Sequence, residues 1–187
     1  MKFVNKLDSL AMNTQSLYQK ASRFAAEKHS EQKVPGSKAN YLLHLSNVAM
    51  EILICSEHST NFDRDFALQV ALLHDVLEDT DTTLQELETH FGKDITEAVM
   101  ALSKDESLPK SQQMQDSLDR IKKLRYEVWA VKLADRITNL QRPPSYWGLD
   151  KKLLYLQQAR QILEALKNGN AYLSHRLEMK ILDYSLF

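Results

Sequence analysis

The sequence predicts an all-α protein on the strength of three observations. Only four Gly and four Pro occur in 187 residues, too few turn-forming residues for a chain of many short strands. Apolar residues recur at three- and four-residue steps along most of the chain, which is the spacing of a helix face. Hydrophobic residues make up 43% and charged residues 26% of the chain, as in globular proteins with a substantial core.

Turn-forming and capping residues divide the predicted helices. Asp63 or Asn61 is expected to cap the third helix and Thr82 or Thr83 the fourth, while Pro109 fits the first turn of a later one. The expected helices cover about residues 7–29, 41–55, 63–79, 84–91, 95–102, 109–121, 127–140, 151–166 and 172–184.

The length predicts one domain over residues 1–187, with its core at about 20–185 and no room for a second catalytic domain. Cys55 is the single cysteine and lies among apolar residues, so we expect it to be buried and unreactive. No segment approaches the ~20 apolar residues of a membrane span, and the N-terminus lacks a signal-peptide pattern. These features predict a cytoplasmic protein that does not engage a membrane.

The charge pattern argues against a nucleic-acid partner. The formal net charge is -1, and Lys and Arg are interspersed with Asp and Glu. Binding to a phosphate backbone requires a concentrated basic face, which this pattern does not supply. The sequence leaves the oligomeric state open.

Four ionisable residues follow the most apolar predicted helix, in the segment LLHDVLED at 72–79. Burying a carboxylate is unfavourable by several kcal/mol unless a cation or a set of donors compensates it. A divalent metal ion would compensate Asp75, with His74 as a second ligand. Glu78 and Asp79 lie about one turn further on, where a general acid or base could act on a metal-activated water.

Two further candidate ligands lie in other apolar helices. His44 occurs within YLLHL at 41–45, and Asp135 within VKLAD at 131–135. Taken singly, each candidate has an ordinary structural role, as a core histidine, a surface ion pair or a helix cap. One metal ion would explain all four together, and two imidazoles with two carboxylates suit Mn²⁺, Fe²⁺, Zn²⁺ or Co²⁺.

The order of His44, His74, Asp75 and Asp135 resembles the HD superfamily of metal-dependent phosphohydrolases. A narrower resemblance, over about residues 24–184, is to the hydrolase domain of the RelA/SpoT alarmone enzymes. Small stand-alone alarmone hydrolases, including the metazoan SpoT homologue, are the most similar. This resemblance rests on HDVLEDT (74–80), FG (91–92), LPK (108–110), VKLADR (131–136) with Asn139, and the spacing from Trp147 to Tyr155.

The resemblance implies a reaction and the residues that carry it. It makes His44, His74, Asp75 and Asp135 the metal ligands, usually of Mn²⁺, although another divalent transition metal could serve. Glu78, Asp79 and Asn139 would order and activate the attacking water. The implied reaction removes the 3′-pyrophosphate of ppGpp or pppGpp and leaves GDP or GTP.

Binding of such an anionic nucleotide also requires cations in the pocket. By the same resemblance, Lys33, Lys110 and Lys151 are the candidates, and Tyr155 could pack against the base or ribose. Each of these residues could equally be an ordinary surface or core residue. Trp147 is expected to be a packing residue.

The sequence departs from the alarmone pattern in the expected nucleotide loop. Asn40 stands where a Pro is common, and residues 33–37 are less basic than usual. The nucleotide preference is therefore open, and the same metal site could hydrolyse ppApp, NADPH or a nucleoside phosphate. A non-catalytic nucleotide-binding module is a third hypothesis, against which the acidic residues beside the ligands argue.

Overall fold

The computed structural model describes residues 13–186, and the secondary structure within this part of the chain is helical apart from one isolated bridge between Lys33 and Asn40. The predicted all-α fold is confirmed. The helices are α1 (Thr14–Lys28), α2 (Leu42–Glu57), α3 (Arg64–Leu73), α4 (Val76–Asp79), α5 (Leu84–Phe91), α6 (Lys93–Leu102), α7 (Lys110–Ile121), α8 (Tyr126–Asn139), α9 (Leu149–Leu166) and α10 (Ala171–Tyr184).

Capping side chains set several helix starts. The carboxylate of Asp63 accepts a hydrogen bond from Phe66 N at 3.0 Å, and the Thr83 hydroxyl accepts one from Glu86 N, so one of the unpaired amides at each helix start finds an acceptor. Pro109 precedes the first turn of α7 as its N-cap and does not lie within it. Residues 7–12 of the first predicted helix lie outside the described residues.

The predicted helix through residue 79 is interrupted. The α3 helix ends at Leu73, His74 and Asp75 form a turn, and α4 is a single further turn. The prediction of one continuous helix over 63–79 was therefore wrong. Periodicity could not reveal the break, because Val76 and Leu77 continue the apolar pattern across it.

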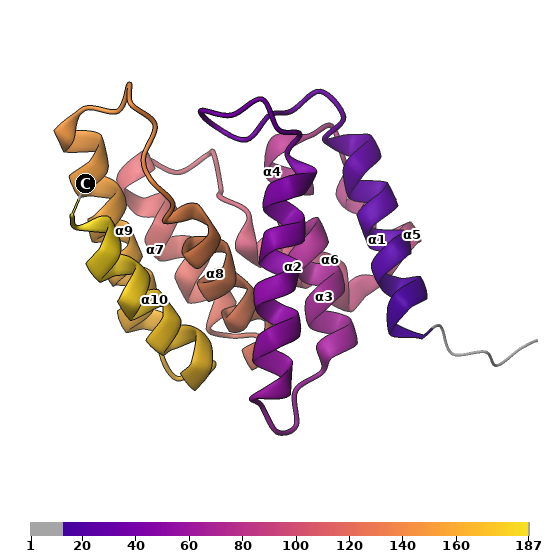
Figure 1. Cartoon of the computed structure of the whole chain (residues 1–187). Helices are drawn as coiled ribbons and strands as arrows, with labels where there is room; N and C mark the ends of the chain where they lie inside the picture. Colours follow the sequence, from indigo (N-terminus) through magenta and orange to yellow (C-terminus); the bar gives the residue numbers. More distant parts are fainter. Residues whose placement is uncertain (1–12, 187) are drawn as a thin grey trace, which may run out of the picture.

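The core forms where α2, α3 and α8 pack against one another, with α1 on one side and α9 and α10 on the other (Figure 1). Every residue of α3 from Phe66 to Leu73 except Gln69 is buried. In α8, most positions from Glu127 to Thr138 are buried as well. His44 and Asp135 lie on these packed helices, and His74 and Asp75 directly follow α3, so the packing fixes their backbone positions.

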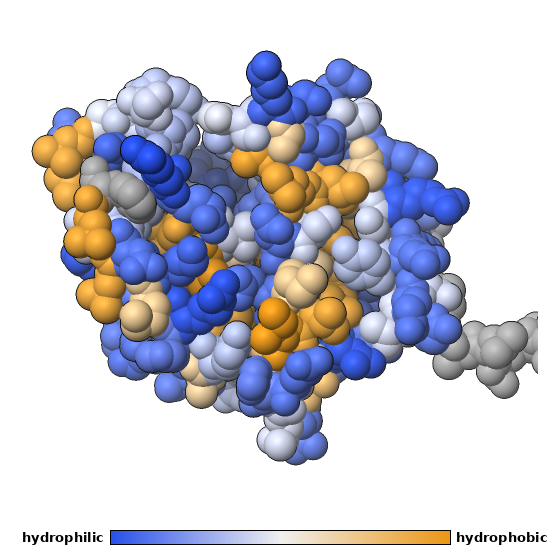
Figure 2. Space-filling view, in the orientation of Figure 1, coloured by the Kyte–Doolittle hydropathy of each residue, from blue (hydrophilic) through white to orange (hydrophobic). Residues whose placement is uncertain are grey.

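Cys55 is fully buried on α2, as predicted, and burial raises the pKa of its thiol to about 12. The same helix leaves Leu43, Met50 and Ile54 exposed. Figure 2 shows apolar surface on the face of the molecule where α2 lies in Figure 1. Among the described residues, none of the helices combines the length and apolarity that crossing a bilayer requires.

Candidate metal centre

Three separate segments bring the four predicted ligands together. His44 comes from α2, His74 and Asp75 come from the turn after α3, and Asp135 comes from α8. The Nε2 atoms of His44 and His74 lie 3.4 Å apart, and the carboxylates of Asp75 and Asp135 approach them to between 3.0 and 3.8 Å. His44, His74 and Asp75 form a group whose donor atoms could hold one metal ion.

The spacing and orientation of these donors fit a divalent cation. Ligand atoms about 2.0–2.2 Å from one ion lie about 2.8–3.6 Å from their neighbours around it, close to the observed separations. The Nδ1 atom of His74 lies 2.8 Å from the carbonyl oxygen of Ala71, which can only accept a hydrogen bond. Nδ1 must therefore carry the proton, and the Nε2 lone pair is directed at the site, as in many metal-ligating histidines.

Without a cation, the cluster depends on protons for its charge balance. Burial acts to raise the pKa of Asp75, but the charge of His74 outweighs it and holds that pKa below the usual range. Burial likewise acts to lower the pKa of His74, and Asp75 outweighs it and raises that pKa well above 6.5. For Asp135, the effect of burial is outweighed by Lys132, whose Nζ lies 3.3 Å away, and the pKa falls. A bound cation would take the place of the His74 proton.

A surrounding layer of donors orients the two carboxylates. The Tyr41 hydroxyl donates to Asp75 Oδ2, and the Asn139 amide donates to Asp135 Oδ1. Such partners hold ligand side chains in place and limit their rotation. Asn139 therefore lies against the cluster, one helical turn after Asp135 on α8.

Glu78 and Asp79 lie one helical turn beyond the cluster. The backbone amides of both residues donate hydrogen bonds to the carbonyl oxygen of Asp75. Their surroundings differ. Both oxygens of Glu78 accept hydrogen bonds from Lys104, one from its backbone N and one from Nζ. The Asp79 residue is exposed and accepts a bond from Gln32 Nε2 at 2.8 Å, and the partial burial of its carboxyl group raises its pKa.

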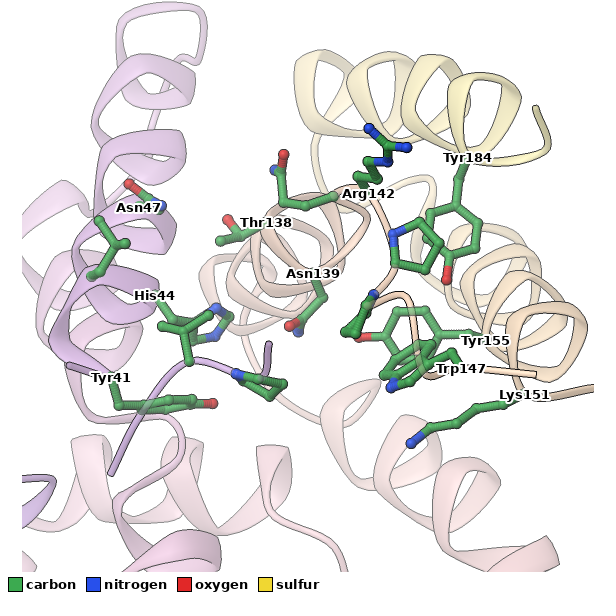
Figure 3. Close-up of a pocket in the computed structure, with 16 residues that line it drawn as sticks. Tyr41, His44, Asn47, Thr138, Asn139, Arg142, Trp147, Lys151, Tyr155 and Tyr184 are labelled. Carbon is green, nitrogen blue, oxygen red and sulfur yellow. The ribbon is translucent and has the colours of Figure 1, made fainter. Parts of the chain in front are cut away.

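A cavity of about 410 Å³ opens beside His44 and Asn139, within the volume range of small-ligand sites. Figure 3 shows its wall: Tyr41 and His44 come from the α2 side, Thr138 and Asn139 from the end of α8, and Tyr155 and Tyr184 face them from α9 and α10. The cavity therefore adjoins the metal cluster on one side and an aromatic wall on the other.

The aromatic wall combines rings in edge-to-face contact with nearby cations. Trp147 and Tyr155 meet edge to face with their ring centroids 5.2 Å apart, and Lys151 Nζ lies 4.3 Å from the Trp147 ring. On α8, the buried guanidinium of Arg136 lies 4.4 Å from the Tyr155 ring. Trp147 was expected to be a packing residue, but it lines the cavity together with Lys151 and Tyr155.

Two predicted substrate contacts are not among the residues that line this cavity. Lys33 and Lys110 are exposed, and neither belongs to its wall. Residues 34 and 35 of the same loop do line it. A β-carbon added at Gly36 would lie only 3.1 Å from the Pro144 side chain, so the loop tip reaches the segment after α8.

Sequence reasoning missed several residues of the site. Arg142 lines the cavity as a second cation, and Lys104 holds Glu78. His29 is almost fully buried, and its imidazole lies 5.0 Å from the Tyr41 ring. A histidine at the end of a helix carries little signal by itself, and the pairing of Lys104 with Glu78 spans 26 residues, so spacing could not reveal either.

Comparisons with known proteins agree with this geometry. Residues 21–146 match the HD domain family. The chain is 31% identical over 176 residues to the guanosine-3′,5′-bis(diphosphate) 3′-pyrophosphohydrolase MESH1 of Xenopus tropicalis, covering 91% of this chain and 96% of that protein. It is 33% identical over 165 residues to MESH1 of Danio rerio, covering 86% and 89%.

A solved structure, that of a metazoan orthologue of SpoT that hydrolyses ppGpp, has a similar fold. It superimposes with a TM-score of 0.77 at 29% identity and covers 92% of this chain and 97% of its own. The family match covers the segment that contains all four ligand candidates of this chain. The chain belongs to the HD domain family, together with the MESH1 proteins and the metazoan SpoT orthologue.

Proposed function

We propose that this chain is a metal-dependent hydrolase that removes the 3′-pyrophosphate of ppGpp or pppGpp. The observation that carries the proposal is the convergence of two imidazoles and two carboxylates beside a cavity of nucleotide size. Relatives named for this reaction cover most of the chain. The product would be GDP or GTP, together with pyrophosphate.

His44, His74, Asp75 and Asp135 would hold the ion. Their mixed nitrogen and oxygen donors suit several divalent transition metals, and we propose Mn²⁺ among these from the resemblance to the alarmone hydrolases. A divalent cation here would lower the pKa of a bound water and draw charge from the phosphoryl oxygens. The protein must then place the phosphate and accept a proton. We also propose that the chain works in the cytoplasm as one HD domain.

Asp79 is the proton acceptor that the geometry favours. Its carboxylate is open to solvent, lies one turn from Asp75, and has one hydrogen-bond donor among the described residues. Both oxygens of Glu78 are already engaged by Lys104, so Glu78 is better suited to orient the water or the phosphate. Asn139, fixed on Asp135, would hold the water on the other side.

The nucleotide would extend along the cavity from the metal cluster to the aromatic wall. Its base or ribose would pack against Tyr155, and Lys151 with Arg142 would face its phosphates. Lys33 and Lys110 remain predicted contacts at the edge of the site. Lys33 directly precedes residues 34 and 35 of the cavity wall, and we expect both lysines to act on the outer phosphates.

A nucleotide panel tests the proposal. Purified protein with Mn²⁺ should convert ppGpp to GDP and pyrophosphate, with ppApp, NADPH and nucleoside monophosphates as comparisons. Turnover of another nucleotide with ppGpp left intact would overturn the substrate assignment and keep the hydrolase. An Asp79→Ala variant should retain bound Mn²⁺ yet lose turnover. If the unsubstituted protein binds ppGpp but turns over no nucleotide, the non-catalytic module is favoured.

A further inference from the structure

We propose that Gln32 is a positioning residue for the hydrolytic reaction, which holds Asp79 through a hydrogen-bond relay that begins at the buried His29. The inference rests on the proposed function, because Asp79 matters only if water attacks at the metal cluster. The relay consists of two contacts. His29 Nδ1 lies 2.5 Å from Gln32 Oε1, and Gln32 Nε2 lies 2.8 Å from Asp79 Oδ2.

The chemistry of the three groups allows one direction of donation. An ionised Asp79 can only accept, so the Gln32 atom that faces it must be the amide nitrogen. The other end of the amide is then an oxygen, and His29 must carry its proton on Nδ1. If His29 were instead protonated on Nε2 alone, two lone pairs would oppose each other and Gln32 would tend to flip. Its oxygen would then face the Asp79 carboxylate.

The state of His29 suits this task. The residue is 1% exposed, and burial lowers the pKa of its imidazole, so the neutral ring is favoured. Its Nε2 atom is buried and has no hydrogen-bond partner among the described residues. A buried ring with one polar contact has little freedom, and it therefore presents a fixed donor to Gln32.

Asp79 requires such a tether more than its neighbour does. Its side chain is exposed at the end of the one-turn helix α4, and Gln32 is its hydrogen-bond donor within residues 13–186. Glu78 is held independently by Lys104. An exposed carboxylate with no partner would sample several rotamers, so Gln32 would keep it in the orientation needed to accept a proton.

Gln32 also belongs to the loop that covers the cavity. Its carbonyl accepts from Tyr41 N at 3.0 Å, which closes the loop stem, and Asn40 ties the same stem to the carbonyls of His29 and Ser30. The Asn40 side chain thus makes bonds that a proline could not. The relay joins the nucleotide loop to the proposed proton acceptor, so the position of one constrains the other.

The Gln32→Glu variant tests the relay with an isosteric change that places a carboxylate against Asp79. We expect kcat for ppGpp to fall by about 10- to 100-fold, the range typical of residues behind a metal site, with KM within about twofold. Gln69→Glu is the matched control, since Gln69 is half-buried on α3 and donates to Asp65 O, away from Asp79. It should keep the kcat of the unsubstituted protein.

Two His29 variants and a spectroscopic measurement complete the test. In the His29→Asn variant, the side-chain amide nitrogen can take the place of Nδ1 as a donor. The kcat of this variant should therefore fall less than the kcat of His29→Leu, which has no donor. The ¹⁵N chemical shifts of the His29 ring should report a proton on Nδ1. That measurement tests the relay even if ppGpp is not the substrate. A proton on Nε2 alone, or a lower melting temperature of Gln32→Glu with unchanged kcat, would overturn the proposal.

Discussion

The two ends of α8 both bury charged residues, but they differ in whether the protein supplies hydrogen-bond partners for these residues. At its start, Glu127 accepts bonds from Asp63 N at 2.8 Å and from Arg125 Nε at 2.9 Å, so both carboxylate oxygens are satisfied. At its other end, buried nitrogens of Arg136 and the hydroxyl of Thr138 find no hydrogen-bond partner among the described residues. Asp135 faces another carboxylate across two imidazoles.

The difference separates structure from function within one helix. A buried charge whose hydrogen bonds the protein itself supplies contributes to stability. A cluster of buried ligands whose negative charge the protein does not neutralise requires a bound cation. The start of α8 secures the N-cap of α3, because Asp63 also caps that helix. The end of α8 serves the metal cluster and the cavity. Substitutions at each end of α8 test whether this division holds.

The largest effect is expected from Asp135→Asn. Losing one anionic ligand should weaken metal binding and lower kcat by more than about 100-fold, beyond the usual effect of residues behind a metal site. Turnover with Mn²⁺ and the bound metal per chain, measured by elemental analysis, check this. Full turnover with a full complement of metal would remove Asp135 from the ligand set and break the comparison.

Metal binding itself should stabilise the protein. A divalent ion present at about 100 times its Kd should add about 2.7 kcal/mol to the free energy of unfolding. For a chain of this size, that corresponds to a rise of about 5–10 °C in the melting temperature, reversed by a chelator. The rise should be retained in Glu127→Ala and reduced in Asp135→Asn. An equal rise in both variants would contradict the division along α8.

Glu127→Ala should affect stability and leave the chemistry unchanged. The change leaves Asp63 N and Arg125 without their acceptor, which should cost about 1–3 kcal/mol of unfolding free energy. Urea unfolding measures the loss. The kcat per folded molecule should be unaltered, and a lowered kcat in fully folded protein would show that the start of α8 also serves the site.

The smallest effect concerns pH. Burial acts to raise the pKa of Glu127, but its bond with Arg125 outweighs this and holds the pKa below 4.5. The group therefore contributes stability above its unfolded pKa and loses it as the pH falls. Melting temperatures of Glu127→Gln should fall less steeply than those of the unsubstituted protein as the pH drops below about 4.5. Parallel curves would contradict the lowered pKa.

The residue types and their order along the chain determined much of this protein by themselves. Scarce Gly and Pro with helical spacing of apolar residues predicted the fold, and Asp63 and Thr83 were among the residues predicted to start helices. These features are local, because a helix forms from contacts three and four residues apart. The four ligand candidates were also identifiable, since polar residues inside apolar helices need a common explanation.

The tertiary structure decided what depends on packing between distant segments. It placed the break at His74 and Asp75, paired Glu78 with Lys104, joined His29 to Asp79 through Gln32, and put Trp147 on the cavity wall. None of these follows from spacing, because each partner is brought near by the packing of other helices. Sequence patterns record which residues a helix buries, and only the fold fixes which of them meet.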